Sequence, residues 1–231
     1  QYNYKIMCGI FGSFKHTNYE LLYDFNKQRG TFSYGHLFAK NEDGAMHIKK
    51  VEGIVELDLM ESLQEDIDYD IFLGHTQAPT SSERDFNPQT SHPFEYGNWI
   101  VAHNGVLSNF EQLKIDHLPE WKCNVDSSVI SALLHEYDTS YSGVELISHV
   151  LGMLEGTLGV WIYDKSGKKV YLARSGSTLF ANLNTGDFSS IRVDDFTELR
   201  ENTIYELDIT GVEEWYRINI TGTFEGKSPF F

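Results

Sequence analysis

The sequence predicts one α+β domain in which antiparallel sheets carry helices on their faces. Three observations lead to this expectation. Short apolar segments joined by turn-rich links occur near both ends of the chain, strongly helical segments lie in its middle, and 231 residues with 41% hydrophobic side chains suffice for one sizeable core. No repeat and no long stretch rich in Pro, Ser and Gly divides the chain, so a single unit is expected.

The first half of the chain is expected to supply mainly strands. In order, it contains a buried strand at 8–14, a short helix at 19–28, strands at 35–40 and 45–51, a helix at 57–65, and buried strands at 69–75 and 99–103. The strands at 35–40 and 45–51 are joined by Asn-Glu-Asp-Gly, a composition typical of tight turns. Residues 77–96 hold three of the five prolines and are predicted to form a long loop, and loops of that length are usually functional.

The second half begins with the most regular helical pattern. After Asp126, which stands where a helix cap is expected, apolar residues recur at helical spacing: Val129, Ile130, Leu133, Leu134 and Tyr137. A second helix is predicted at 144–154. The remaining chain is expected to be largely antiparallel sheet, with strands at 157–164, 169–175, 177–183, 203–208 and 213–220.

Charge and composition exclude several classes of protein. The chain has 34 acidic and 18 basic side chains, a formal charge of −16, and no basic stripe, which disfavours direct binding of nucleic acid. Its apolar runs are too short to span a membrane and its start lacks a secretory signal, so a cytoplasmic protein is expected. The two cysteines are predicted to be thiols rather than a disulfide. The sequence has neither a metal-ligand pattern nor a glycine-rich phosphate loop, so no cofactor is expected.

Cys8 is the first candidate for chemistry. It follows Met7, so translation from Met7 and removal of that methionine would leave cysteine as the first residue. A terminal cysteine holds a nucleophilic thiol beside its own α-amine, whose reference pKa of about 7.7–8.0 suits it to accept the thiol proton. The alternative is an ordinary buried cysteine in a strand.

Five ordered motifs resemble those of the class II glutamine amidotransferases, which are N-terminal nucleophile hydrolases. They are Met7-Cys8-Gly9-Ile10-Phe11-Gly12, Gln28-Arg29-Gly30, Gly74-His75-Thr76, His103-Asn104-Gly105-Val106-Leu107-Ser108-Asn109, and Val125-Asp126-Ser127-Ser128-Val129-Ile130. The resemblance implies a four-layer αββα sandwich with antiparallel sheets over residues 8–231. Residues 1–7 would then be an extension, a propeptide or cloning residues.

The resemblance also implies roles for single residues. Cys8 matches the nucleophile that forms a γ-glutamyl thioester, and Asn104 with the backbone N–H of Gly105 matches the oxyanion hole. Taken alone, Asn-Gly after a strand is more typical of a tight turn. Asp126 matches the residue that binds the α-ammonium group of glutamine, and the alternative is a plain helix cap. Arg29 matches a positioning arginine near the nucleophile, with an exposed helix-end arginine as the alternative.

The loop after residue 74 departs from the family pattern. Gln77 stands where the family has an arginine for the α-carboxylate of glutamine, and a neutral amide lacks both the charge and the bidentate fork. Thr80 matches a family threonine of the same pocket. Arg84 is a candidate for the missing charge, and the alternative is an ordinary exposed loop arginine. The Gln-Ala-Pro-Thr segment also looks like that of standalone phage-encoded members.

These matches predict a glutaminase that releases ammonia from L-glutamine for a separate synthase or transferase. Two alternatives stay open: hydrolysis of another amide, because of Gln77, and a non-catalytic module, because a peptide-bonded Cys8 has no free amine. Retention of Cys8, Asn104, Gly105 and Asp126 together argues against the module. The sequence does not identify the ammonia acceptor, and a homo-oligomer is left open.

Overall fold

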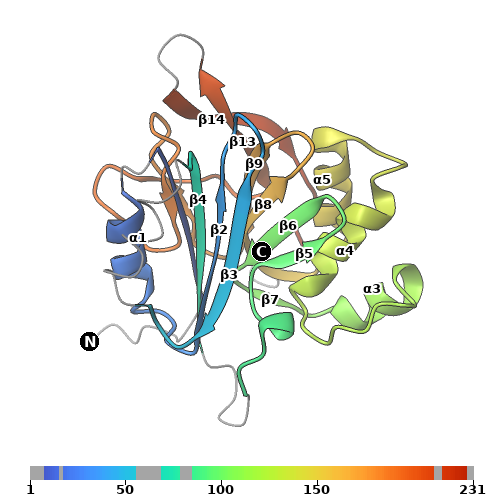
Figure 1. The fold of residues 1–231 in the computed structure, drawn as a ribbon. Coiled ribbons are helices and arrows are strands. Elements are labelled where there is room, and N and C mark those ends of the chain that lie inside the picture. The colour runs from blue at the N-terminus through green and yellow to red at the C-terminus, as the bar shows by residue number, and fades with distance from the viewer. Residues whose placement is uncertain (1–7, 16–17, 56–68, 79–84, 211–214, 228–231) are drawn as a thin grey trace.

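The computed structural model describes residues 8–15, 18–55, 69–78, 85–210 and 215–227. Within them, two antiparallel sheets pack face to face, with one helix on the outer face of the first sheet and three helices on the side of the second (Figure 1). This arrangement confirms the predicted α+β class and its four-layer αββα form with antiparallel sheets.

The first sheet has the spatial order β12-β10-β11-β1-β4-β2-β3. Its strands, in chain order, are β1 Gly9–Phe14, β2 Ser33–Ala39, β3 Met46–Glu52, β4 Ile71–Gln77, β10 Phe180–Ala181, β11 Phe188–Ser189 and β12 Thr197–Glu198. β1 and β2 both pair with β4, and all three strands are buried over their full length. Strands buried on both faces read as continuous apolar runs, which is why the sequence pattern identified β1 and β4.

The second sheet has the order β14-β13-β9-β8-β6-β5, with β7 pairing to β8 beside β6. Its strands, in chain order, are β5 Phe94–Tyr96, β6 Trp99–His103, β7 Val106–Leu107, β8 Gly156–Asp164, β9 Lys169–Ser175, β13 Thr203–Thr210 and β14 Trp215–Thr223. The hairpins β8–β9 and β13–β14 confirm the predicted antiparallel end of the chain.

The helices cover the outer faces of the two sheets. α1 (Tyr19–Asn26) contacts β1 and β4, while α4 (Ser128–Tyr137) contacts β5 and β6 and packs against α5 (Gly143–Met153) and α3 (Phe110–His117). A short 3₁₀ helix, Pro88–Thr90, precedes β5.

The alternation of strand side chains divides the core into three layers. Ile10 of β1 and Ile100 of β6 belong to the layer between the sheets. Phe11, the next residue of β1, instead packs with Tyr23 under α1, and Val101 packs under α4 and α5. Because successive side chains of a strand point to opposite faces, each central strand contributes to two of these layers.

One sequence-based expectation is not tested by the structure, and several others differ from it. The helix predicted at 57–65 lies outside the described residues, and the described part of the loop predicted at 77–96 contains the 3₁₀ helix and β5. The strand predicted at 177–183 is reduced to β10. α3 was not predicted, because its buried face consists of Leu113 and it has no apolar periodicity.

Both cysteines are thiols outside any disulfide, as predicted. No helix among the described residues has the length and apolar character that crossing a membrane requires.

The tight packing between the sheets predicts that adding a methyl group at Gly12 lowers the stability of the fold. A β-carbon at Gly12 of β1 would lie 2.6 Å from Cζ of Phe188 and 2.8 Å from Cδ2 of Leu73, both in that layer. We expect Gly12→Ala to lower the free energy of unfolding by about 1–3 kcal/mol through overpacking. Gly152→Ala on α5 is the control, because nothing lies within 4 Å of its added carbon and the change should be neutral or stabilising by up to about 1 kcal/mol. Equal urea midpoints for the two variants would contradict this packing.

Candidate active site

Cys8 lies at the end of the sandwich where β1 begins. It is half-buried and directly precedes Gly9, which pairs with Thr76 near the end of β4. Ile10 faces the layer between the sheets. Strand alternation therefore places Cys8, two residues earlier, on the same inner face. Gln77 ends β4 at this edge of the sheet, on the face shared by Leu73 and Ile71.

Glycine is required at Gly9 and at Gly30, because neighbouring atoms lie too close to leave room for a side chain. A β-carbon at Gly9 would lie 2.7 Å from Oγ1 of Thr76 and 2.8 Å from Oδ1 of Asn26. A β-carbon at Gly30 would overlap the backbone carbonyl of Gln77. The Cys-Gly and Arg-Gly pairs thus bring the start of β1 and the segment after α1 close to the end of β4.

Asn104 and Gly105 do not form the tight turn that the dipeptide alone predicts. Asn104 exchanges both backbone hydrogen bonds with Gly159 of β8, at 2.7 and 2.9 Å. β6 and β7 pair with β8 in one continuous register, in which His103 lies opposite Val160 and Val106 opposite Thr157. The Asn-Gly pair is therefore a strand continuation that is distorted at the glycine.

The distortion at Gly105 leaves its N–H directed away from β8. In an antiparallel pair, every second residue directs its N–H and C=O groups away from the partner strand. Asn104 bonds to β8 with both groups, so the next residue, Gly105, directs its N–H away from β8. A β-carbon at Gly105 would overlap the carbonyl oxygen of Thr157 and lie 2.6 Å from Nε2 of His103. Glycine is thus needed here, and the pairing with β8 does not use its N–H.

Ser190 connects Asn104 to β1. Asn104 is buried, and its Nδ2 donates a hydrogen bond to Oγ of Ser190 at 3.3 Å. The same Oγ accepts a bond from the N–H of Ile10 at 2.9 Å. The structure therefore brings Asn104 of the second sheet to the strand that starts at Cys8. The sequence reasoning did not identify Ser190, which is 180 positions from Ile10 and lies in no recognised motif.

Arg29 belongs to the same network. Its Nη2 donates to Oγ1 of Thr178 at 3.3 Å, and Thr178 Oγ1 donates to the carbonyl oxygen of Ser190 at 2.9 Å. Arg29 is partly buried, so the alternative of an exposed helix-end arginine is wrong.

His103 links the distorted strand to the start of α4. Its Nε2 lies 3.0 Å from the carbonyl oxygen of Thr157 and its Nδ1 lies 2.9 Å from Oγ of Ser127. A carbonyl accepts only, so Nε2 carries a proton, and the hydroxyl of Ser127 lies within donor distance of both Nδ1 and Oδ1 of Asp126, the latter at 3.3 Å. Burial lowers the pKa of His103 below its ordinary value, and nearby Asp126 and the bond to Thr157 raise it by less. The folded protein thus holds this imidazole neutral.

Asp126 lies one residue before Ser127, the N-cap residue of α4. Its Oδ2 accepts the N–H of Leu107 in β7 at 2.9 Å, and its Oδ1 accepts the N–H of Ser127 at 2.8 Å. The carboxylate is half-buried and lies beside the strand that carries Asn104 and Gly105. Two backbone donors thus fix the position of this carboxyl group.

Gln77 is buried, and its Oε1 accepts a hydrogen bond from Oγ of Ser33 at 2.9 Å. In the family that this sequence resembles, this position carries an arginine. Here it carries a neutral side chain that is anchored to Ser33. Thr80 and Arg84 lie outside the described residues.

This arrangement places a thiol, a side-chain amide and a backbone N–H that the pairing with β8 does not use at one end of the sandwich. Those groups are what acyl transfer through a cysteine requires: a nucleophile and two donors for a developing oxyanion. Within the described part of the chain, His, Cys, Asp and Glu form no group of three that could hold a metal.

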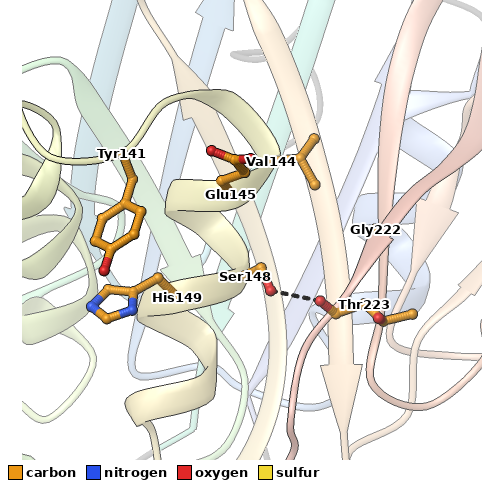
Figure 2. Close-up of a pocket in the computed structure, with 7 residues that line it drawn as sticks. All are labelled: Tyr141, Val144, Glu145, Ser148, His149, Gly222 and Thr223. Carbon is orange, nitrogen blue, oxygen red and sulfur yellow. Dashed lines mark hydrogen bonds between the residues drawn. The ribbon is translucent and has the colours of Figure 1, made fainter.

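A separate groove of about 510 Å³ lies between α5 and β14. Figure 2 shows Tyr141 beside His149, with ring centroids 4.3 Å apart, and Ser148 donating to the carbonyl oxygen of Thr223 at 2.7 Å. Of the predicted site residues that the structure describes, none lines this groove.

Comparison with known proteins gives sequence relatives and fold relatives. No protein-family model matches the sequence. The chain is 31% identical over 182 residues to the glutamine–fructose-6-phosphate aminotransferase (isomerizing) of Francisella tularensis, a match that covers 75% of this chain and 29% of that protein. The enzyme of the same name from Oceanobacillus iheyensis is 27% identical over 207 residues, covering 86% and 34%. The chain thus spans between 29% and 34% of the length of these relatives.

Solved structures share the fold. Glutamine phosphoribosylpyrophosphate amidotransferase from B. subtilis, complexed with ADP and GMP, matches with a TM-score of 0.66 and 20% identity over 92% of this chain and 49% of that one. A glutamine aminotransferase class-II domain protein from Silicibacter pomeroyi matches with a TM-score of 0.59 and 15% identity over 94% of this chain and 99% of that one.

The neutral, buried His103 predicts a pH dependence of stability. An unfolded histidine has a pKa near 6.5, so below that pH the unfolded chain binds a proton that the folded chain does not. The free energy of unfolding should therefore fall as the pH drops from 6.5 to 5.5, by up to about 1.4 kcal/mol for this group. His36, whose pKa burial also lowers, contributes with the same sign. Urea unfolding should show a shallower slope in His103→Gln, and an unchanged slope would contradict a neutral His103.

Proposed function

The chain belongs to the class II glutamine amidotransferases, and we propose that it hydrolyses the side-chain amide of L-glutamine through a thioester on Cys8. The observation that carries the proposal is the position of Cys8 directly before β1, the strand whose backbone at Ile10 is joined through Ser190 to the buried amide of Asn104. Sequence similarity to enzymes named as glutamine-dependent aminotransferases supports glutamine as the substrate.

The proposed reaction has two halves. The thiol of Cys8 gives its proton to its own α-amine and attacks the amide carbon, and Asn104 Nδ2 and the N–H of Gly105 stabilise the resulting oxyanion. The C–N bond then breaks, and the leaving nitrogen takes the proton to depart as ammonia. Water attacks the thioester, gives a proton to the same amine, and releases glutamate as the thiol is restored.

This chemistry requires Cys8 to be the first residue, so residues 1–7 are proposed to be absent from the active form. A peptide-bonded Cys8 has no α-amine to accept the proton. If residues 1–7 stay attached, the chain corresponds to a precursor or to the non-catalytic module.

Substrate recognition is proposed to involve two oppositely charged ends of glutamine. Asp126, fixed by backbone N–H groups of Leu107 and Ser127, is proposed to bind the α-ammonium group. Thr80 is proposed to line the same pocket. Arg84 is proposed to bind the α-carboxylate, because Gln77 is neutral and anchored to Ser33.

A second candidate function follows from the same observation on Gln77. If no cation meets the α-carboxylate, the preferred substrate is an amide without that group. The burial of Gln77 and its bond to Ser33 are the specific features that favour this alternative.

The ammonia is proposed to pass to a synthase or transferase on a separate protein, in the cytoplasm. The acceptor named for the relatives, fructose 6-phosphate, is a property of those longer enzymes. Co-purification from the native host tests this step. Free ammonia as the only product, with no synthase or transferase bound, would contradict it.

The central test compares two forms of the protein that differ at the first residue. Protein beginning at Cys8 should hydrolyse glutamine, while protein beginning at Gln1 should be at least about 10³-fold slower because its cysteine lacks the amine base. Cys8→Ser should be inactive and Cys123→Ser fully active, and Asn104→Ala should lower kcat by about 10²–10³. Equal rates for the two forms would contradict the proposed role of the Cys8 α-amine as the base. Inactivity of both forms would favour the non-catalytic module.

The second test asks which residue binds the α-carboxylate group of glutamine. A charged hydrogen bond is worth about 1.5–3 kcal/mol, so Arg84 should give glutamine an advantage of about 10- to 150-fold in kcat/KM over its α-carboxamide. Arg84→Ala should remove that preference, while Arg200→Ala, an exposed arginine, should keep it. No preference in the unaltered protein would favour the amide without a carboxylate.

A further inference from the structure

We infer that Ser190 is a positioning residue for the oxyanion hole, because its hydroxyl fixes the side-chain amide of Asn104 against the strand that carries Cys8. This inference rests on the proposed function and adds a residue that lies in none of the five motifs. It is drawn from the hydrogen bonds at one buried hydroxyl group.

The hydrogen-bonding capacity of that hydroxyl is fully used. A serine hydroxyl has one proton and two acceptor lone pairs. Ser190 Oγ donates to the carbonyl oxygen of Ile10 at 3.2 Å, and it accepts from the N–H of Ile10 at 2.9 Å and from Nδ2 of Asn104 at 3.3 Å. Because its single proton goes to Ile10, Ser190 meets Asn104 as an acceptor. This assignment turns the NH₂ group of Asn104, rather than its oxygen, toward Ser190.

The consequence for Asn104 is a fixed direction for its second N–H. The backbone of Asn104 is held by its two bonds to Gly159, and one amide proton is held by Ser190. An amide group is planar, so fixing one N–H sets the direction of the other. That second N–H is the donor that the proposed oxyanion hole uses. Preorganised donors stabilise a transition state because they need no reorientation when charge develops.

Ser190 also holds β1 through its backbone. It donates its backbone N–H to the carbonyl oxygen of Ile10 at 2.8 Å, and Ile10 lies two residues after Cys8. One serine therefore joins the backbone of β1 at Ile10 to Asn104, which follows β6 of the other sheet. Thr178 holds the carbonyl of Ser190 and accepts a bond from Arg29, so Arg29 acts on the site through this chain of contacts.

Ser189 offers a matched control next to Ser190. It is also fully buried, and its Oγ accepts bonds from Nδ2 of Asn26 at 2.8 Å and from the N–H of Ile191 at 3.0 Å. Its hydroxyl thus makes a similar number of buried hydrogen bonds but none to Asn104. Ser189→Ala should resemble Ser190→Ala in stability and differ from it in catalysis.

The experiment measures steady-state glutamine hydrolysis by protein beginning at Cys8. Ser190→Ala should lower kcat by about 10- to 100-fold, less than the loss of the donor itself, with KM changed less than about threefold. Ser189→Ala should keep kcat within about twofold. The double variant Ser190→Ala/Asn104→Ala should be no slower than Asn104→Ala alone, because Ser190 acts through that amide. Thermal melting of each variant verifies that it is folded.

Each outcome separates this inference from the proposed function. If the unaltered protein hydrolyses glutamine but Ser190→Ala keeps its kcat, or if the losses in the double variant multiply, the positioning role is overturned and the glutaminase stands. Inactivity of the unaltered protein overturns both. If Ser190→Ala does not fold, Ser190→Cys, whose sulfur is a weaker acceptor of similar size, is subject to the same two criteria.

Discussion

The face-to-face packing of the two sheets is the constraint on which the candidate site depends. Apolar side chains of both sheets, such as Ile10 and Ile100, meet in the layer between them. Strand alternation repeats every second residue, so the same inner face continues past that layer to Cys8 on β1 and to Asn104 after β6. The hydrophobic core thereby determines which side chains meet at the end of the sandwich. A one-residue shift in the register of β1 or β6 would turn Cys8 or Asn104 to the opposite face of its sheet.

The helices on the outer faces of the sheets stabilise the end of the sandwich where Cys8 and Asn104 lie. α4 is tied to the strand of Asn104 and Gly105 by its first residues, through Ser127 to His103 and Asp126 to Leu107. On the other side, Thr76 near the end of β4 donates its hydroxyl to the carbonyl oxygen of Asn26 at the end of α1. The burial of these polar groups makes each bond expensive to lose, since an unpaired buried group costs about 1–3 kcal/mol. The site is therefore fixed by packing first and by hydrogen bonds second.

Much of the fold could be predicted from the sequence, and the reason is local. β1, β4, β6 and the hairpin β8–β9 are apolar runs bounded by turn residues, and α4 and α5 have helical periodicity. α3 lacks such periodicity, and the short strands β10–β12 carry too few residues to show alternation. The roles proposed for Cys8 and Asn104 come from family motifs. Ser190 could not be found this way, because its partners lie 86 and 180 positions away and only the folded chain brings them together.

The most direct test of this account is the intact mass of the protein before and after 6-diazo-5-oxo-L-norleucine, a diazoketone that carries the glutamine backbone and alkylates an activated thiolate. Protein beginning at Cys8 should gain one adduct, and peptide mapping should place it on Cys8 and not on Cys123. Protein beginning at Gln1 should gain none. An unmodified Cys8 in the trimmed protein, or an adduct on Cys123, would contradict the claim that this end of the sandwich is a glutamine site with Cys8 as its nucleophile.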